Sequence, residues 1–109
     1  MKKVSSLEEF KAIERAEPFY FLKNSTTCPI SGSAYEEVKN FSDDHSDIPV
    51  YYLNVQEARP LSNQLAEEFG IKHESPQLFL IKDGKVLAHD SHWNITYDKL
   101  EKLTKEHVR

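Results

Sequence analysis

The chain has 109 residues, of which 39% are hydrophobic and 29% charged, and its formal net charge is −4 at pH 7. This length suffices for one compact core, so we expect residues 1–109 to fold as a single domain. The acidic balance provides no general attraction to nucleic acid or to anionic membranes, which excludes polyanion binding as the expected function.

The first half of the chain alternates helix and strand signals. Two serines near the start each precede a glutamate by three positions, and apolar residues follow at helical spacing, which predicts a capped amphipathic helix. Aromatic and β-branched runs are typical of buried strands. The elements predicted here are a helix over residues 6–16, a strand over Phe19–Lys23, a helix with an apolar stripe of Ala34, Val38 and Phe41, and a strand over Ile48–Val55.

The second half adds one more helix and then a hairpin. Pro60 near the start of an apolar stripe and Gly70 just past its end predict a helix over Arg59–Phe69. Asp83-Gly84 between two apolar runs is a strong signal for a two-residue hairpin turn. The remaining predicted elements are a strand over Gln77–Lys82, a strand over Lys85–Asp90, a loop over Ser91–Ile95 and a final helix capped by Thr96.

This order of elements defines the expected fold class. Two strands joined through a helix are predicted to run parallel, because parallel strands need a long crossover connection. The hairpin then contributes an antiparallel pair. We therefore expect an α/β fold in which a central mixed sheet of about four strands is flanked by helices.

The one cysteine of the chain lies in the stretch Thr26-Thr27-Cys28-Pro29-Ile30-Ser31, between an apolar strand and a helix. Pro29 suits a first helical position, so Cys28 is expected at a helix N-terminus, where unpaired N–H groups and the helix dipole favour the thiolate. Ser31 either donates a hydrogen bond to that thiolate or is a plain helix-start serine. The pattern indicates a reactive thiol, with a buried and inert cysteine as the alternative.

The cysteine count also bears on the expected compartment. One cysteine closes no intrachain disulfide, which fits a reducing environment. The apolar runs are far shorter than the roughly 20 residues that span a bilayer, and charged residues interrupt the N-terminal region before a signal peptide is complete. We therefore expect a cytoplasmic protein with no membrane partner. His89 and His92 fall short of a zinc pattern, so no metal site is expected.

The order of elements around the cysteine resembles the thioredoxin fold over nearly the whole chain. Pro76 falls immediately before the first hairpin strand, where thioredoxin-like proteins carry a cis-proline beside the reactive cysteine. The resemblance implies a cis Ser75-Pro76 bond, with the backbone N–H and C=O of Ser75 facing outward. These groups would then pair with an extended substrate segment beside Cys28.

A narrower resemblance concerns the motif Thr27-Cys28-Pro29-Ile30-Ser31, which is similar to that of the monothiol bacilliredoxins. The lone cysteine and the stretch Trp93–Thr96 are similar to that family as well. The resemblance implies a thiol–disulfide oxidoreductase that removes bacillithiol, a small thiol of some Gram-positive bacteria, from protein mixed disulfides. Its partners would be bacillithiolated proteins and a low-molecular-weight thiol.

The same resemblance implies a role for each residue of the motif. Cys28 would be the attacking thiolate, with Thr27, Pro29 and Ser31 supporting it. Ser31 would occupy the place of the second cysteine in dithiol relatives, so an external thiol would have to resolve the mixed disulfide. Bacillithiol would act as a co-substrate, and no bound cofactor is expected.

Substrate contacts are expected from the loops that flank the motif. Ser75 and Pro76 would receive the substrate backbone, and His92 and Trp93 follow the hairpin where thioredoxin-like chains return to the active face. An exposed Trp93 would pack on the substrate, and the alternative is a core residue at the sheet edge. A cationic or hydrogen-bonding rim for the malate group of bacillithiol is expected from Lys23, Thr26, Thr27, Lys72 and His73.

Two other functions remain open on the sequence alone. An iron–sulfur cluster carrier would resemble the monothiol glutaredoxins, but Pro29-Ile30 departs from their Cys-Gly-Phe-Ser motif. A thioredoxin-like interaction module would leave Cys28 without a catalytic role. A phosphatase loop is not expected, because the position six residues after the cysteine is Ala34 rather than arginine.

Overall fold

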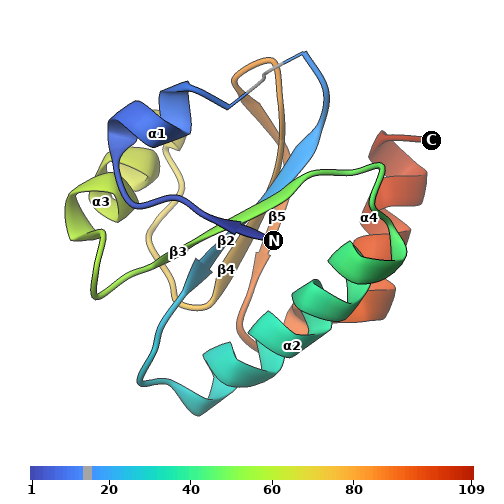
Figure 1. Cartoon of the computed structure of the whole chain (residues 1–109), viewed down its shortest axis with the longest axis horizontal. Coiled ribbons are helices and arrows are strands. Elements are labelled where there is room, and N and C mark those ends of the chain that lie inside the picture. Colours follow the sequence, from blue (N-terminus) through green and yellow to red (C-terminus); the bar gives the residue numbers. More distant parts are fainter. Residues whose placement is uncertain (14–15) are drawn as a thin grey trace.

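The computed structural model describes residues 1–13 and 16–109, which form one mixed β-sheet covered by helices on both faces (Figure 1). The elements in chain order are β1 (Lys2–Lys3), α1 (Leu7–Lys11), β2 (Phe19–Asn24), α2 (Pro29–Asp44), β3 (Val50–Asn54), α3 (Arg59–Phe69), β4 (Gln77–Lys82), β5 (Lys85–Ser91), the 3-10 helix η1 (His92–Asn94) and α4 (Tyr97–His107). None of the helices in these ranges is long and apolar enough to cross a membrane.

The sheet has the strand order β1-β3-β2-β4-β5. Strands β1 and β2 both run parallel to β3, whereas β4 is antiparallel to β2 and to β5. The predicted α/β class with a mixed sheet is confirmed. The sheet has one strand more than the four expected, because Lys2 and Lys3 pair with Tyr51 and Tyr52 at its edge.

Strand β2 separates two apolar clusters because its side chains alternate between the faces of the sheet. Phe19 and Phe21 pack with residues from α1 and α3, while Tyr20 and Leu22 pack with residues from α2 and α4. Figure 1 shows this arrangement, with α1 and α3 on one side of the sheet and α2 and α4 on the other. The predicted stripe of Ala34, Val38 and Phe41 is buried on α2, in the second cluster.

A buried hydroxyl ties the central strand to the last helix. Tyr20 Oη donates to the carbonyl oxygen of Leu100 at 3.0 Å and lies 2.8 Å from Thr104 Oγ1. Burial raises the pKa of Tyr20 to about 12, so the phenol stays protonated and available as a donor. The contact fixes α4 over β2.

The predicted N-terminal helix begins where expected but is shorter. Ser6 caps α1, with its Oγ accepting from the N–H of Glu9 at 3.1 Å. The helix ends at Lys11, because the N–H of Ala12 is shared between two carbonyls of the preceding turn and Ile13 turns into the core. The predicted extent over residues 6–16 is therefore wrong, and residues 14 and 15 lie outside the described residues.

The other element boundaries follow local backbone chemistry. Strand β3 starts at Val50 rather than Ile48, because the N–H of Ile48 bonds in a turn to His45 and Pro49 has no N–H. Gly70 ends α3 with φ of +64°, as predicted for a C-terminal cap. Asp83 and Gly84 both have positive φ, as a two-residue hairpin turn requires.

The segment after the hairpin is more ordered than the predicted loop. The loop was expected over Ser91–Ile95, but Ser91 completes β5 and the next three residues form η1. Thr96 then caps α4, with its Oγ1 accepting from the N–H of Lys99 at 3.1 Å. The helix cap predicted from the sequence is confirmed.

One cation is buried in the core beside the first cluster. The side chain of Lys23 is fully buried, and its Nζ donates to the carbonyl oxygen of Ser62 at 2.9 Å and lies 3.3 Å from Nδ1 of His73. It also lies 5.7 Å from the ring centre of Phe79. Burial lowers the pKa of Lys23 from 10.5 to about 8, and burial with the nearby Lys23 charge lowers the pKa of His73.

The buried lysine predicts an unusual dependence of stability on pH. Because the unfolded chain holds the Lys23 proton more tightly, the free energy of unfolding should rise between about pH 8 and 10.5. We expect this rise, by at most about 3 kcal/mol, in the wild type and not in Lys23→Met. Urea unfolding followed by circular dichroism across this pH range measures it.

The matched control for this experiment is Lys82→Met, which removes an exposed lysine at the end of β4. This variant should keep the wild-type rise. An identical pH dependence in the wild type and Lys23→Met would contradict the assignment of a depressed pKa to the buried lysine.

Candidate active site around Cys28

Cys28 lies between the central strand and the longest helix. It follows β2 after a short turn and is the N-cap residue of α2, with Pro29 in the first helical turn. Its backbone is extended, with φ of −100° and ψ of 122°, and its side chain is partly exposed. The predicted position at a helix start is confirmed, and the alternative of a fully buried cysteine is wrong.

The start of α2 favours the ionised thiol. The pKa of Cys28 is lowered, mainly by the backbone N–H of Ser31; burial opposes this as the second effect, and the backbone N–H of Ile30 adds a smaller lowering. The Ser31 hydroxyl contributes the smallest lowering effect. Its Oγ is buried and makes no hydrogen bond to any described residue, which agrees with its weak effect on the thiol.

The turn before Cys28 is held by a side chain from the turn that follows β3. Gln56 Oε1 accepts from the N–H of Thr26 at 3.1 Å, and its Nε2 donates to Ser25 Oγ at 2.8 Å and to Thr27 Oγ1 at 3.2 Å. Thr27 therefore supports the cysteine through the shape of the turn. Gln56 was not predicted from the sequence, because nothing local links it to a motif about 30 residues away.

The loop before β4 lies beside the end of β2. Gln77, the first residue of β4, pairs with Lys23, which places the preceding residues near the turn that carries the cysteine. The Ser75-Pro76 bond is cis, as the resemblance implied. Pro76 is buried and its carbonyl oxygen accepts from the N–H of His92 at 3.0 Å.

The short helix η1 completes this side of the site. Ser91 pairs with Gln77, so His92 follows directly beside the Ser75-Pro76 bond, and its Nδ1 lies 3.6 Å from Glu74 Oε2. Trp93 is 67% exposed, so the alternative of a core residue is wrong. The short helix η1 also packs against α2, the helix that begins after Cys28.

The residues expected to form a polar rim around the site differ in their exposure to solvent. Thr26, Thr27 and Lys72 are exposed and His73 is half-buried. Lys23 was expected at the rim as well, which is wrong because its side chain is fully enclosed and engaged with Ser62 and His73. Through these two contacts the Lys23 side chain links β2 to α3 and to the loop before Pro76, inside the protein.

A cavity of about 390 Å³ opens on the other side of Cys28, between α2 and the end of β3. It is lined by Asn24, Ser25, Thr26, Cys28, Gly32, Tyr35, Glu36, Tyr52 and Asn54. The sequence analysis missed most of these residues. The available signal was the spacing of Gly32, Tyr35 and Glu36, which places them on one face of a helix that starts at the cysteine.

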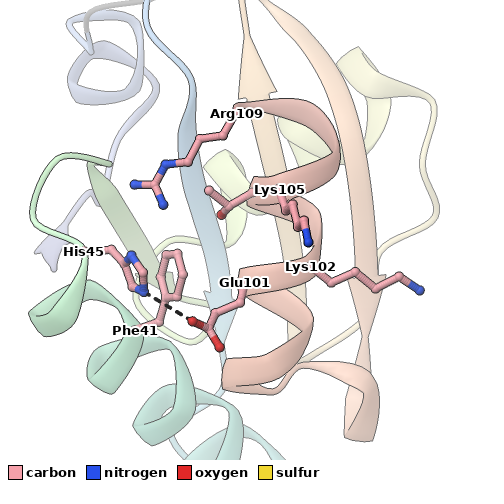
Figure 2. A pocket seen from close by; sticks show the side chains of 7 residues that line it. Phe41, His45, Glu101, Lys102, Lys105 and Arg109 are labelled. Atoms are coloured by element: carbon pink, nitrogen blue, oxygen red, sulfur yellow. Dashed lines mark ion pairs between the residues drawn. The ribbon is translucent and has the colours of Figure 1, made fainter.

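A different hollow lies far from the cysteine. Figure 2 shows it between α2 and α4, with Phe41 and His45 on one wall and Glu101, Lys102 and Lys105 on the other. Because Phe41 stands 13 positions after Cys28 in the same helix, the two are about 20 Å apart along the axis. This hollow is not part of the site. No three metal-binding side chains gather anywhere in residues 1–13 and 16–109.

Comparison with known proteins identifies the family of the chain. The family model of the monothiol bacilliredoxin BrxC matches residues 1–100. A solved structure of a thioredoxin-fold protein assigned as an oxidoreductase is 37% identical, with a TM-score of 0.86 over 94% of this chain and 91% of that chain.

More distant structures share the fold alone. Thioredoxin f2 from Chlamydomonas reinhardtii is 16% identical, with a TM-score of 0.79 over 99% of this chain and 96% of its own. Fasciola hepatica thioredoxin is 14% identical, with a TM-score of 0.79 over 98% and 99% of the two chains. Together with the match over residues 1–100, these findings show that the chain has the thioredoxin fold and belongs to the monothiol bacilliredoxin family.

Proposed function

We propose that this protein is a thiol–disulfide oxidoreductase that removes bacillithiol from protein mixed disulfides. The observation that carries the proposal is one partly exposed thiol at a helix N-terminus, with its pKa lowered and a serine where a second sulfur would stand. Membership of the monothiol bacilliredoxin family supports bacillithiol as the small thiol.

The first step is an exchange of one disulfide for another. The Cys28 thiolate attacks the bacillithiol sulfur of the protein mixed disulfide, forming a bond between Sγ and that sulfur. The bond to the target protein breaks, and the target sulfur leaves as a thiolate that takes a proton from water. No net oxidation occurs, because one disulfide and one thiolate are present before and after the step.

The second step needs a thiol from outside the chain. Ser31 stands one helical turn from Cys28 and has no sulfur with which to close an internal disulfide. A second bacillithiol thiolate attacks the bacillithiol sulfur attached to Cys28, which releases the Cys28 thiolate and a bacillithiol disulfide. A separate thiol protein would complete the same exchange. Both routes fit the reducing environment of a cytoplasm.

The target protein would dock on the side of Cys28 that carries the Ser75-Pro76 bond. Ser75 would offer its backbone to an extended target segment, and Trp93 offers an exposed aromatic surface next to His92. The attacking, attacked and leaving sulfurs stand in line, so the bacillithiol sulfur lies between Cys28 Sγ and the target sulfur. The rest of bacillithiol then extends sideways from this line, toward the cavity between α2 and β3.

A mass measurement tests the first step. A model protein carrying bacillithiol as a mixed disulfide is incubated with the wild type and with Cys28→Ser, and intact masses are recorded. We expect the bacillithiol mass on the wild-type chain, release of the model thiol, and no transfer to Cys28→Ser. The same model protein carrying glutathione should transfer more weakly.

Two outcomes bear on the proposal in opposite ways. Transfer to Cys28 with discrimination against glutathione supports a selective bacilliredoxin. No transfer from either mixed disulfide would refute the redox function and favour the cluster-carrier and interaction-module alternatives.

The Ser31 hydroxyl predicts a shift in thiol reactivity. Because it lowers the pKa of Cys28, Ser31→Ala should raise that pKa and slow alkylation by iodoacetamide on the acidic side of the titration. The thiolate is the reacting species, so the pH profile of the alkylation rate measures the change. The variant should not lose stability, because the buried hydroxyl makes no hydrogen bond to a described residue.

Ser33→Ala is the control for this measurement, because Ser33 is exposed two positions further along α2. Its alkylation profile should match the wild type. If Ser31→Ala also matched the wild type, the hydroxyl would have no electrostatic role at the thiol.

A further inference from the structure

The cavity beside Cys28 is lined by acceptors and aromatic rings rather than by cations. Glu36 is the one carboxylate among its lining residues, and no lysine, arginine or histidine lines it. The nearest cation on the same helix is Lys39, whose charge acts on Tyr35, but its Nζ is paired with Asp43 at 3.2 Å. The local charge that a bound molecule meets is therefore negative.

A directed chain of hydrogen bonds leaves an unpaired amide oxygen just behind the cavity wall. Lys3 Nζ lies 3.1 Å from Glu57 Oε1 and the contact lowers the pKa of that carboxyl, so Glu57 is ionised and only accepts. Asn54 must then turn its Nδ2 to Glu57, at 3.4 Å, which leaves its Oδ1 to accept from Asn24 Nδ2 at 2.9 Å.

This direction fixes the amide of Asn24. With its Nδ2 committed to Asn54, its Oδ1 faces no donor among the described residues, although the side chain is about nine-tenths buried. An enclosed amide oxygen without a donor keeps its full partial negative charge. Asn24 lines the cavity together with Cys28, so this oxygen adds negative potential close to the reacting sulfur.

Two tyrosines add a further attraction for positive charge. The rings of Tyr35 and Tyr52 lie edge to face, with centres 5.4 Å apart, and both line the cavity. Burial and the neighbouring Tyr52 raise the pKa of Tyr35, so its phenol is neutral at pH 7. The faces of neutral aromatic rings attract ammonium groups.

We propose that this cavity binds the free α-amino group of a cysteinyl thiol while its sulfur is bonded to Cys28. The inference rests on the proposed function and names the chemical feature by which the site selects its small thiol. In bacillithiol the cysteine is joined through its carboxyl group, so its amino group is free and mostly protonated near pH 7. In glutathione the cysteine nitrogen is part of an amide and carries no charge.

Two small disulfides that differ in this one feature test the proposal. Cystine carries free amino groups, and N,N′-diacetylcystine carries the same carboxylates with acylated nitrogens. The rate at which each forms a mixed disulfide with Cys28 is followed by intact mass in the wild type and in Glu36→Gln. The ratio of the two rates is taken within each protein, because any change in the intrinsic reactivity of the Cys28 thiol affects both rates equally and cancels.

The wild type should prefer cystine about threefold to fivefold more strongly than Glu36→Gln does, as expected for a partly screened charge pair. Added salt should reduce this difference. The matched control is Glu67→Gln, which removes an exposed carboxylate of α3 on the opposite side of the sheet and should keep the wild-type preference.

A second variant tests the direction of the amide chain without touching the cavity. In Glu57→Gln the residue at position 57 can donate, so Asn54 and Asn24 are free to reverse and to present Nδ2 in place of Oδ1. We expect a weaker preference for cystine in this variant, with circular dichroism unchanged.

Failure of the inference and failure of the proposed function give different results. Equal preferences in the wild type, Glu36→Gln and Glu57→Gln would overturn amino-group recognition, even if bacillithiol still moved from a target protein to Cys28. If Cys28 reacted with neither small disulfide and took no bacillithiol from a target protein, both proposals would fall.

Discussion

The structure depends on the complete burial of one strand. Strand β2 is paired on both edges, by β3 and β4, and its alternating side chains enter the apolar clusters on both faces of the sheet. A strand enclosed in this way has its position fixed by the whole core. The turn after it therefore delivers Cys28 to a constant place at the start of α2. The loop before β4 reaches the same edge, because β4 is the hydrogen-bonded neighbour of β2.

The two sides of the cysteine differ in their chemistry. Toward β4 lie a buried proline, the exposed indole of Trp93 and backbone groups, which form the surface proposed above for the target polypeptide. Toward β3 lies a cavity with a carboxylate and two phenols, of a size fitted to a small molecule. The helix N-terminus stands between them and stabilises negative charge on the sulfur itself. In the proposed reaction, backbone groups promote the reactivity of the thiol, and side chains on either side of it distinguish the two sulfurs of the bound disulfide.

Local patterns were sufficient to predict much of this arrangement. The bounds of α3 and β4, the hairpin turn and the helix start at Pro29 follow from residues adjacent in the sequence, and all are confirmed. The features that the sequence did not predict depend on distant partners. The lysine pair that forms β1 carries no apolar pattern and is a strand only because β3 is beside it. From the sequence, Lys23 was expected at the surface, because its partners Ser62 and His73 lie far away in the chain. The cavity likewise needs β3 to stand beside α2.

The single thiol of this chain has a thermodynamic consequence. A protein with two neighbouring cysteines has a reduction potential of its own, since both partners of its disulfide belong to one molecule. Here the only cysteine of the sequence is Cys28, and Ser31 one turn away closes no bond to it. Every disulfide that this cysteine forms therefore includes a second molecule, and the fraction of protein in that state depends on the concentration of the molecule. The oxidation level of Cys28 is thus set jointly by the protein and by the composition of the surrounding thiol pool.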